Sequence, residues 1–305
     1  MKEYQIKRIL KIFILLLLIG ITYYYKDNIY KPTKVKENNI QNKEELKVTN
    51  NNLEIQFLDV GEADCALINS NGEYALIDAG NTIDGNKIVK YFESLGIRDF
   101  KYLFGTHAHE DHIGGLANVI YNFNIGTVYM PNVPSEYKSY HNVLKALNKK
   151  NLDLNNPIND EEYKLGESTL KIIYNGENEE DINNSSLIIK LTYKNKSFLF
   201  TGDTTKEVED KILDKDLNSN LLKVSHHGSN DASSANFLVK VHPEYAIISV
   251  GKDNDYYHPH QVTIDKLERI GTKIYRTDLD GTIIVKSDGE NINIETIKTN
   301  TNTGD

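Results

Sequence analysis

The hydrophobic pattern predicts a domain of alternating strands and helices that begins at residue 53. Short apolar runs bounded by Gly, Asn or Asp predict strands at 53–60, 66–70, 74–80, 101–106, 127–131, 169–174, 186–203 (a hairpin), 221–229 (running into a loop), 245–251, 273–277, 281–287 and 291–297. Amphipathic spacing predicts helices at 87–97, 112–123, 139–150, 205–215, 234–241 and 261–271. Several predicted strands end in His or Asp, and this recurrence is the main indication of function.

The first 25 residues show a different pattern. An apolar run from Ile9 to Tyr25, interrupted only by Lys11 and Thr22, predicts an N-terminal transmembrane anchor or uncleaved signal. A cleaved signal peptide is the alternative, but no small-residue cleavage motif follows the run, which favours the anchor. Basic residues before the run predict a single-pass protein of the cell membrane, with everything after Tyr25 extracytoplasmic.

Polar segments flank the predicted domain. Residues 26–52 are rich in Lys, Asn and Glu, which predicts a flexible linker. Residues 53–298 form the predicted domain, and 299–305 a disordered tail.

Composition narrows the function classes. Cys65 is the single cysteine, so intramolecular disulfides and cysteine-based zinc sites are excluded, and it is interpreted as a small core residue. The formal charge is −9 overall, with 35 basic and 44 acidic residues. Residues 1–50 hold ten of the basic and five of the acidic residues, which leaves residues 51–305 near −14. This balance disfavours tight electrostatic binding of nucleic acid.

A histidine-rich run carries the candidate chemistry. His107, His109, Asp111 and His112 follow a predicted strand and precede a helix. In a loop, the first two rings can face one metal ion and the Asp–His pair a second, with nitrogen and oxygen ligands suited to zinc or a similar ion. Seven of the nine histidines fall at strand ends of this kind, at 107, 109, 112, 226, 227, 258 and 260.

Six sequence blocks indicate a family. They read FLDVGEADCALI, LIDAG, THAHEDHIGG, FLFTGD, LLKVSHHGS and SVGKDNDYYHPH, in this order. Over residues 53–290 the chain resembles the metallo-β-lactamase superfamily, and within it the metallohydrolase domain of ComEC-type competence proteins. The resemblance implies an α/β (α+β) fold, an αββα sandwich of two mixed sheets with helices outside and the metal site at one edge.

The resemblance also implies two divalent metal ions and their ligands. The implied ligands are His107 and His109 for the first ion, Asp111, His112 and His227 for the second, and Asp203 as the bridge. His226 is the alternative to His227, as a ligand or as a residue that supports one. Asp78 is implied to orient the histidine loop through hydrogen bonds.

One departure from the family pattern concerns the first ion. Many members supply a third histidine there, but this chain has no histidine from 142 to 225. Asn183 or Asn184 could offer an amide oxygen or hold a metal-bound water, and a loop-capping role for this pair is the alternative. Zn²⁺ is the favoured metal, with Mn²⁺ as the alternative.

Two further features lie near the predicted site. The resemblance suggests that His258 donates a proton to the leaving oxygen or hydrogen-bonds a phosphate oxygen; a turn histidine beside Pro259 is the alternative. The acidic turn from Gly61 to Asp64 could line the entrance of the site or be solvated.

The expected function is metal-dependent hydrolysis by a metal-activated hydroxide, with Asp111 and His258 as candidate catalytic residues. ComEC-type relatives imply an extracytoplasmic phosphodiesterase or DNA nuclease. One alternative is hydrolysis of another surface ester, namely a phosphocholine or teichoic-acid phosphodiester, a lactone or a thioester. Another is a metal-stabilised module with little turnover that works beside a separate DNA-uptake channel, since one membrane helix cannot itself form a channel.

Overall fold

The computed structural model describes residues 53–298, except residue 178. The predicted anchor (1–25), linker (26–52) and tail (299–305) therefore lie outside the described residues. Across the described part of the chain, no helix is both long enough and apolar enough to cross a membrane.

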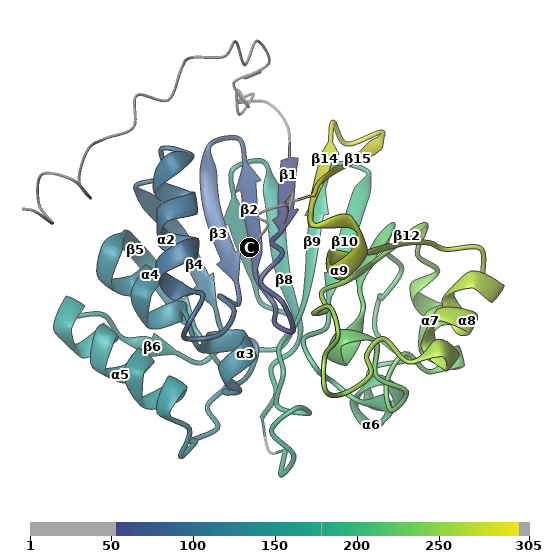
Figure 1. Ribbon diagram of the computed structural model, residues 1–305, viewed down its shortest axis with the longest axis horizontal. Coiled ribbons are helices and arrows are strands. Elements are labelled where there is room, and N and C mark those ends of the chain that lie inside the picture. Colours follow the sequence, from purple (N-terminus) through teal and green to yellow (C-terminus); the bar gives the residue numbers. More distant parts are fainter. Residues whose placement is uncertain (1–52, 178, 299–305) are drawn as a thin grey trace, which may run out of the picture. The chain divides into compact units, whose positions relative to one another are not determined.

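Two sheets form the centre of the fold (Figure 1). The first has the order β15-β14-β1-β2-β3-β4-β5-β6. Its strands are β1 (Leu53–Phe57), β2 (Ala66–Ser70), β3 (Glu73–Ile77), β4 (Asp99–Phe104), β5 (Asn124–Tyr129), β6 (Leu154–Asn155), β14 (Thr282–Ser287) and β15 (Ile292–Ile297). Strands β3 to β6 run parallel, while β15, β14, β1, β2 and β3 pair antiparallel in turn.

The second sheet has the order β13-β12-β11-β10-β9-β8-β7. Its strands are β7 (Glu162–Leu165), β8 (Ser168–Tyr174), β9 (Ile188–Tyr193), β10 (Lys196–Phe200), β11 (Leu221–Lys223), β12 (Tyr245–Ile248) and β13 (Lys273–Arg276). Strands β10 to β13 are parallel, and β7 to β10 are antiparallel. Both sheets are therefore mixed, as the sequence predicts.

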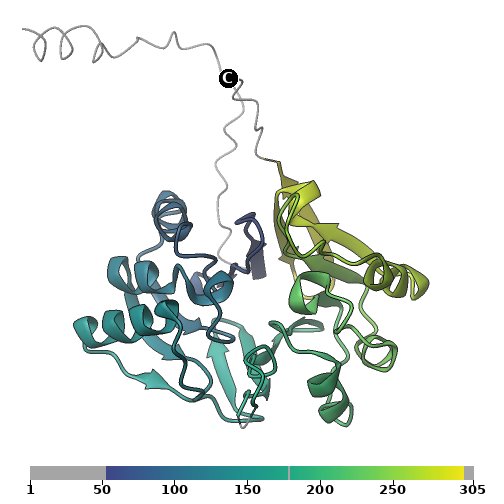
Figure 2. The same ribbon diagram turned by 60° about the horizontal axis from the view of Figure 1, so that its bottom comes forward.

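Helices cover the outer face of each sheet, as Figure 2 shows from below. Those on the first sheet are α2 (Gly85–Ser94), α4 (Leu116–Asn122) and α5 (Lys138–Lys150), and those on the second are α6 (Lys206–Lys211), α7 (Ala235–Val241) and α8 (Gln261–Arg269). Short helices α3 (Glu110–Ile113), η1 (Ser225–Gly228) and α9 (Thr277–Asp280) lie between strands. The fold is a mixed α/β arrangement with the helix–sheet–sheet–helix layering that the sequence predicts.

Three apolar clusters match these layers. One joins α2, α4 and α5 to the first sheet, the second fills the space between the sheets, and the third joins the second sheet to α6, α7 and α8. Alternation explains the pattern on β10, where Phe198 and Phe200 face the central cluster and Leu199 faces the helices. Cys65 is buried in the first cluster, in agreement with its interpretation as a core residue.

The helix predicted over 112–123 is instead two helices, because the chain must pass a crowded point at Gly114 and Gly115. A Cβ atom on Gly114 would lie 2.3 Å from the nitrogen of Thr82, and one on Gly115 would lie 2.2 Å from the carbonyl oxygen of Ala79. The α3 helix therefore ends at Ile113, and α4 begins only at Leu116. The short elements β6, β7 and α9 have no matching prediction, since few residues in them carry a periodic signal.

Candidate metal centre

The predicted site residues follow strands that end at one edge of the sandwich. Asp78 follows β3 and His107 follows β4, two parallel strands of the first sheet. Asp203 follows β10 and His227 follows β11, two parallel strands of the second sheet. Because parallel strands end on the same side, each sheet delivers its His and Asp residues to a common edge.

Three groups of potential ligands lie here: one joins Asp64, Asp78 and His112, and the other two share Asp203. Of these two, one is His107, His109 and Asp203, and the other is Asp111, His112, Asp203 and His227. Within each group the potential ligand atoms lie within 4.8 Å of one another. His107 Nε2 and His109 Nδ1 face each other at 2.9 Å, and His227 Nε2 lies 3.2 Å from Asp111 Oδ2.

Hydrogen bonds leave the Nε2 atoms of His112 and His227 directed into this site. His112 Nδ1 lies 2.8 Å from Asp78 Oδ2, and His227 Nδ1 lies 2.8 Å from the carbonyl oxygen of Ser249. A carbonyl oxygen accepts only, as does an ionised carboxylate, so each Nδ1 carries the proton. Each Nε2 then faces a carboxylate of its group at 3.2 Å, where a bound cation would take the place of a second ring proton.

Asp78 lies beneath the histidine loop and accepts three hydrogen bonds. Thr106 donates its backbone N–H to Oδ1 and its hydroxyl to Oδ2, each at 2.8 Å, and the His112 ring supplies the third. Asp78 is 1% exposed, and burial raises the pKa of its carboxyl despite the nearby His112 ring. Its backbone has φ +58°, which Asp tolerates better than most residues.

The consecutive residues His226 and His227 occupy different positions. Both have φ near +50°, a conformation rarely adopted by residues other than Gly. His227 is buried within the Asp111, His112 and Asp203 group. His226 belongs to neither group; its Nδ1 lies 3.2 Å from Asp231 Oδ1, and its ring lines the pocket above.

The electrostatics of the site favour positive charge. Burial alone would lower the pKa of His227, but Asp203, Asp111 and Asp64 outweigh it and raise this pKa to about 9. The pKa of His112 is likewise held well above its usual value, because Asp203, Asp111 and Asp78 outweigh burial. For His107, burial and the neighbouring His112 lower the pKa well below the usual value, so its ring is neutral, as a ligand must be.

The donor set fits a divalent cation. His112 Nε2 and Asp203 Oδ1 are buried and have no hydrogen-bond partner. Buried polar atoms are nearly always satisfied, so two such atoms within one His and Asp cluster fit the binding of a cation. Imidazole nitrogens and carboxylate oxygens suit zinc, manganese or iron. This cluster implies divalent metal binding without fixing which metal.

A pocket of about 400 Å³ opens above the two groups and is lined by Glu62, His109, Glu110, Asp111, Tyr137, Asn183, Asp203, His226, His227, Tyr256 and His258. His258 lies on its rim, with Nδ1 3.1 Å from Glu62 Oε1. Tyr137 contacts the His109 ring edge to face, and Tyr256 stacks on His258. None of the described residues that line this pocket is Lys or Arg.

Asn184 lies outside both groups. Its Oδ1 accepts hydrogen bonds from the backbone N–H of Thr205, at 3.0 Å, and from the Thr205 hydroxyl, at 2.9 Å. The amide therefore supports the start of α6, which is the loop-capping alternative. Asn183 lines the pocket instead, and its Oδ1 is buried without a hydrogen-bond partner.

The structure adds supporting residues that motif spacing does not reveal. Ser186 Oγ lies 3.1 Å from His107 Nδ1 and also accepts the N–H of Asp203 at 3.0 Å. Asp64 lies next to His112 and His227, and the buried Lys223 lies next to Asp64. The acidic turn before β2 was the available signal for Asp64, but an acidic turn alone cannot distinguish a buried side chain from a solvated one.

Comparisons with known proteins agree with this geometry. Residues 58–252 match the family described as the metallo-beta-lactamase superfamily. ComE operon protein 3 of Bacillus subtilis is 26% identical over 251 residues, which cover 75% of this chain and 32% of that protein. Competence protein ComA of Neisseria gonorrhoeae is 28% identical over 240 residues, covering 77% of this chain and 32% of that protein. The chain thus spans about a third of the length of these relatives.

Solved structures share the fold. The metallo-beta-lactamase fold protein YhfI from Bacillus subtilis superposes with a TM-score of 0.54 at 9% identity, covering 77% of this chain and all of that one. CmlA, a diiron beta-hydroxylase from Streptomyces venezuelae, gives 0.54 at 13% identity, covering 82% of this chain and 55% of that one. The chain belongs to the metallo-beta-lactamase superfamily and is related to its ComEC-type competence proteins.

Proposed function

We propose that this chain is a metal-dependent phosphodiesterase with two divalent ions. His107, His109 and Asp203 would hold one ion, and Asp111, His112, Asp203 and His227 the other. The observation that carries the proposal is the shared carboxylate of Asp203 between two His and Asp groups. When bound, divalent ions supply Lewis acidity, which lowers the pKa of water and neutralises charge on a phosphoryl oxygen.

The chain's own residues orient the substrate and supply a proton to the leaving oxygen. Asp111 is the more open carboxylate, with its side chain 29% exposed against 3% for Asp203, so it is the one that reaches an incoming ester. His258 faces the same pocket, with Glu62 holding its Nδ1. In the imidazolium form of this ring, Glu62 accepts from Nδ1–H while Nε2–H can donate its proton to the leaving oxygen.

Nucleic acid is the favoured phosphodiester. One relative is named a competence protein. Tyr137 and Tyr256, 47% and 67% exposed, both line the pocket, where Tyr137 contacts His109 and Tyr256 contacts His258. Exposed aromatic rings can stack on bases of any sequence. The absence of Lys and Arg from the described lining favours stacking over a tight electrostatic grip.

The substrate class is tested with the purified full chain supplied with zinc or manganese. Single-stranded DNA, duplex DNA, a choline phosphodiester, a lactone and a thioester are compared at equal concentration. We expect cleavage of DNA, with single strands cleaved faster. Cleavage of the choline ester alone would favour a small surface ester, which a pocket of about 400 Å³ also accommodates. A metal-replete chain that cleaves none of the five would favour the alternative of a metal-stabilised module with little turnover.

Tyr256→Ala is expected to slow cleavage of single-stranded DNA by about tenfold, because base stacking on an aromatic ring contributes roughly 1–3 kcal/mol. Cleavage of the choline phosphodiester should change less than about twofold, since it has no base to stack. Initial rates on both substrates check this. Tyr121→Ala is the matched control, since Tyr121 is 38% exposed and lies on α4 away from the pocket. Equal losses on both substrates would contradict the stacking role.

Zinc is expected to stabilise the fold. At free zinc about 100 times the dissociation constant, mass action contributes about 2.7 kcal/mol. For a domain of this size that raises Tm by roughly 5–10 °C. Thermal melts with zinc and with a chelator measure the shift. His107→Ala should reduce it, and His141→Ala, on the exposed face of α5, should retain it.

We further propose that residues 1–25 anchor the protein in the cell membrane with the domain extracytoplasmic, and that its partner is a DNA-uptake channel. The apolar run from Ile9 to Tyr25 supports the anchor. Protease accessibility of the domain in intact cells tests the orientation. Co-purification with a membrane channel tests the partner.

A further inference from the structure

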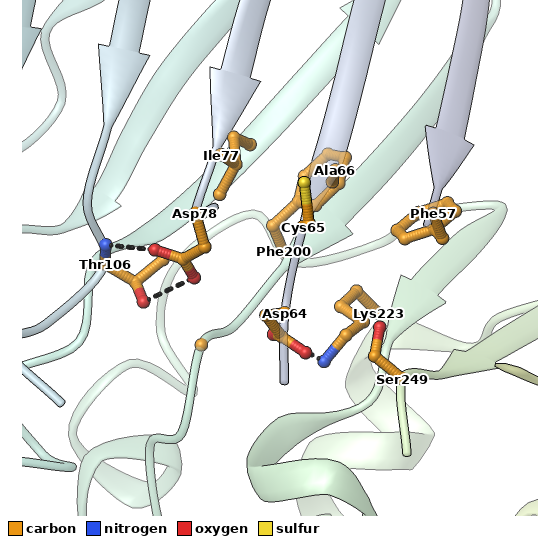
Figure 3. A pocket seen from close by; sticks show the side chains of 11 residues that line it. Phe57, Asp64, Cys65, Ala66, Ile77, Asp78, Thr106, Phe200, Lys223 and Ser249 are labelled. Carbon is orange, nitrogen blue, oxygen red and sulfur yellow. Dashed lines mark hydrogen bonds and ion pairs between the residues drawn. The ribbon is translucent and has the colours of Figure 1, made fainter. Parts of the chain in front are cut away.

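Lys223 is a buried cation that lies behind the candidate metal centre. It ends β11 and is 3% exposed. Its Nζ lies 2.7 Å from Asp64 Oδ2 and donates to the carbonyl oxygen of Val224 at 3.1 Å. Figure 3 shows Lys223 and Asp64 reaching toward each other, the first from the second sheet and the second from the loop before β2. The salt bridge therefore links the two sheets.

The surroundings of this pair exclude bulk water. The cavity that it lines measures only about 10 Å³, and apolar side chains that include Phe57 and Phe200 form part of its lining. A buried charge is costly unless it is paired, and removing one partner leaves the other uncompensated. The charges of Asp64 and Lys223 therefore act at close range on whatever lies beside them.

What lies beside Asp64 is the group of Asp111, His112, Asp203 and His227. The Asp64 N–H donates to the carbonyl oxygen of Asp111 at 3.0 Å, and its carbonyl oxygen accepts from the N–H of Gly80 at 2.8 Å. Its Oδ1 lies 3.6 Å from His227 Nδ1, and its Oδ2 lies 4.0 Å from His112 Nδ1. Asp64 Oδ1 is buried and accepts no hydrogen bond.

The tautomers of the two rings do not depend on Asp64. Asp78 and the carbonyl of Ser249 already accept the Nδ1 protons of His112 and His227. Asp64 adds negative charge on the side of each ring opposite to Nε2, and Lys223 holds that charge in place. The group of His107, His109 and Asp203 makes no hydrogen bond or ion pair with Asp64 among the described residues.

We propose that Asp64 and Lys223 are positioning residues for the metal group of Asp111, His112, Asp203 and His227. The negative charge of Asp64 favours a bound cation through the rings of His112 and His227. Lys223 holds the Asp64 carboxylate in place and partly balances its charge. The inference rests on the proposed metal-dependent function. It predicts that zinc affinity rises when the summed charge of positions 64 and 223 becomes negative and falls when that charge becomes positive. A purely structural salt bridge would instead affect folding alone.

The experiment measures zinc affinity of the full chain by competition with a chromophoric chelator, together with thermal melts. Four variants are compared with the wild type: Asp64→Asn, Lys223→Gln, the double variant, and Lys190→Gln. Lys190 is the matched control, since it is also buried on the second sheet, on β9, and pairs with Asp216 at 2.8 Å. The zinc step that belongs to the His107 and His109 group serves as an internal reference.

We expect Asp64→Asn to weaken one zinc step by about 10–100-fold, the range seen for residues that support metal ligands. The double variant, which leaves no charge, should bind zinc more tightly than Asp64→Asn and more weakly than Lys223→Gln. Lys190→Gln should match the wild type.

Two results would overturn the inference while leaving the proposed function intact. One is a zinc affinity of Asp64→Asn within about threefold of the wild-type affinity, because this change is well below the expected loss. The other is equal zinc affinity of Lys223→Gln and the double variant, a comparison that still applies if Asp64→Asn does not fold. A wild-type chain that binds neither zinc nor manganese would overturn the proposed function and this inference with it.

Discussion

Asp203→Asn is expected to lower the rate of phosphodiester hydrolysis by at least about 10³-fold, which corresponds to about 4 kcal/mol of transition-state stabilisation. Asp203 is the one residue common to both candidate metal groups, and it is 2% exposed. Asn keeps the shape of the side chain but removes its charge and replaces one acceptor oxygen with a donor. Both proposed ions therefore lose the shared negative charge, and Asn offers one oxygen where the carboxylate offers two. Hydrolysis of bis-p-nitrophenyl phosphate with added zinc or manganese measures the loss.

The control for this variant must show that the fold survives. Asp216→Asn is suitable, because Asp216 is an exposed carboxylate between α6 and β11 that pairs with Lys190 of β9. It belongs to neither candidate metal group and does not line the pocket. It should retain full activity, and both variants should show the same circular dichroism spectrum. Activity of Asp203→Asn near that of the wild type would remove the proposed two-ion mechanism from consideration.

Asp78→Ala is expected to lower the free energy of unfolding by about 4 kcal/mol. The change leaves the backbone N–H and hydroxyl of Thr106 and the Nδ1 of His112 without their acceptor. Each buried group left unsatisfied costs roughly 1–3 kcal/mol, and Ala at φ +58° adds about 1 kcal/mol of backbone strain. For a domain of this size Tm should fall by roughly 10 °C. Urea and thermal unfolding measure both quantities.

Asp78→Asn separates stability from metal binding. Asn tolerates the left-handed backbone and still accepts from the Thr106 N–H through its amide oxygen. Its amide nitrogen would face His112, where it can only donate, and would disfavour the tautomer that leaves Nε2 free. We expect most of the stability to remain while zinc affinity falls about 10–100-fold. Loss of stability without loss of zinc binding would contradict this role of Asp78.

The sequence predicts most of the framework because its patterns are local. Strand β2 (Ala66–Ser70) has the bounds that its apolar run predicts, and α5 (Lys138–Lys150) differs from its prediction by one residue. Elements shorter than one clear period, such as β6 (Leu154–Asn155), carry too few residues to show a pattern. The break between α3 and α4 depends on contacts of Gly114 and Gly115 with residues 79–82, which are distant in sequence.

The candidate site also has features that the sequence predicts and features that depend on the tertiary structure. The run from His107 to His112 marks the chemistry in the sequence, because its residue types and spacing suit metal ligands wherever the loop lies. The choice between His226 and His227 depends on the loop conformation after β11, which directs His227 to Asp111 and His226 to Asp231. The role of Asn184 also depends on the tertiary structure, because its amide oxygen accepts hydrogen bonds from Thr205.

By itself, the sequence determined the family, the alternation of strands and helices, and the His and Asp residues at strand ends, since each is written in a short stretch of chain. Only the tertiary structure decided that Asp203 is shared by two groups and that Lys223 and Asp64 meet behind the rings. Asp64 and Lys223 are 159 positions apart and belong to different sheets. Their pairing arises where the two sheets pack, and burial there leaves each charge with no better partner than the other.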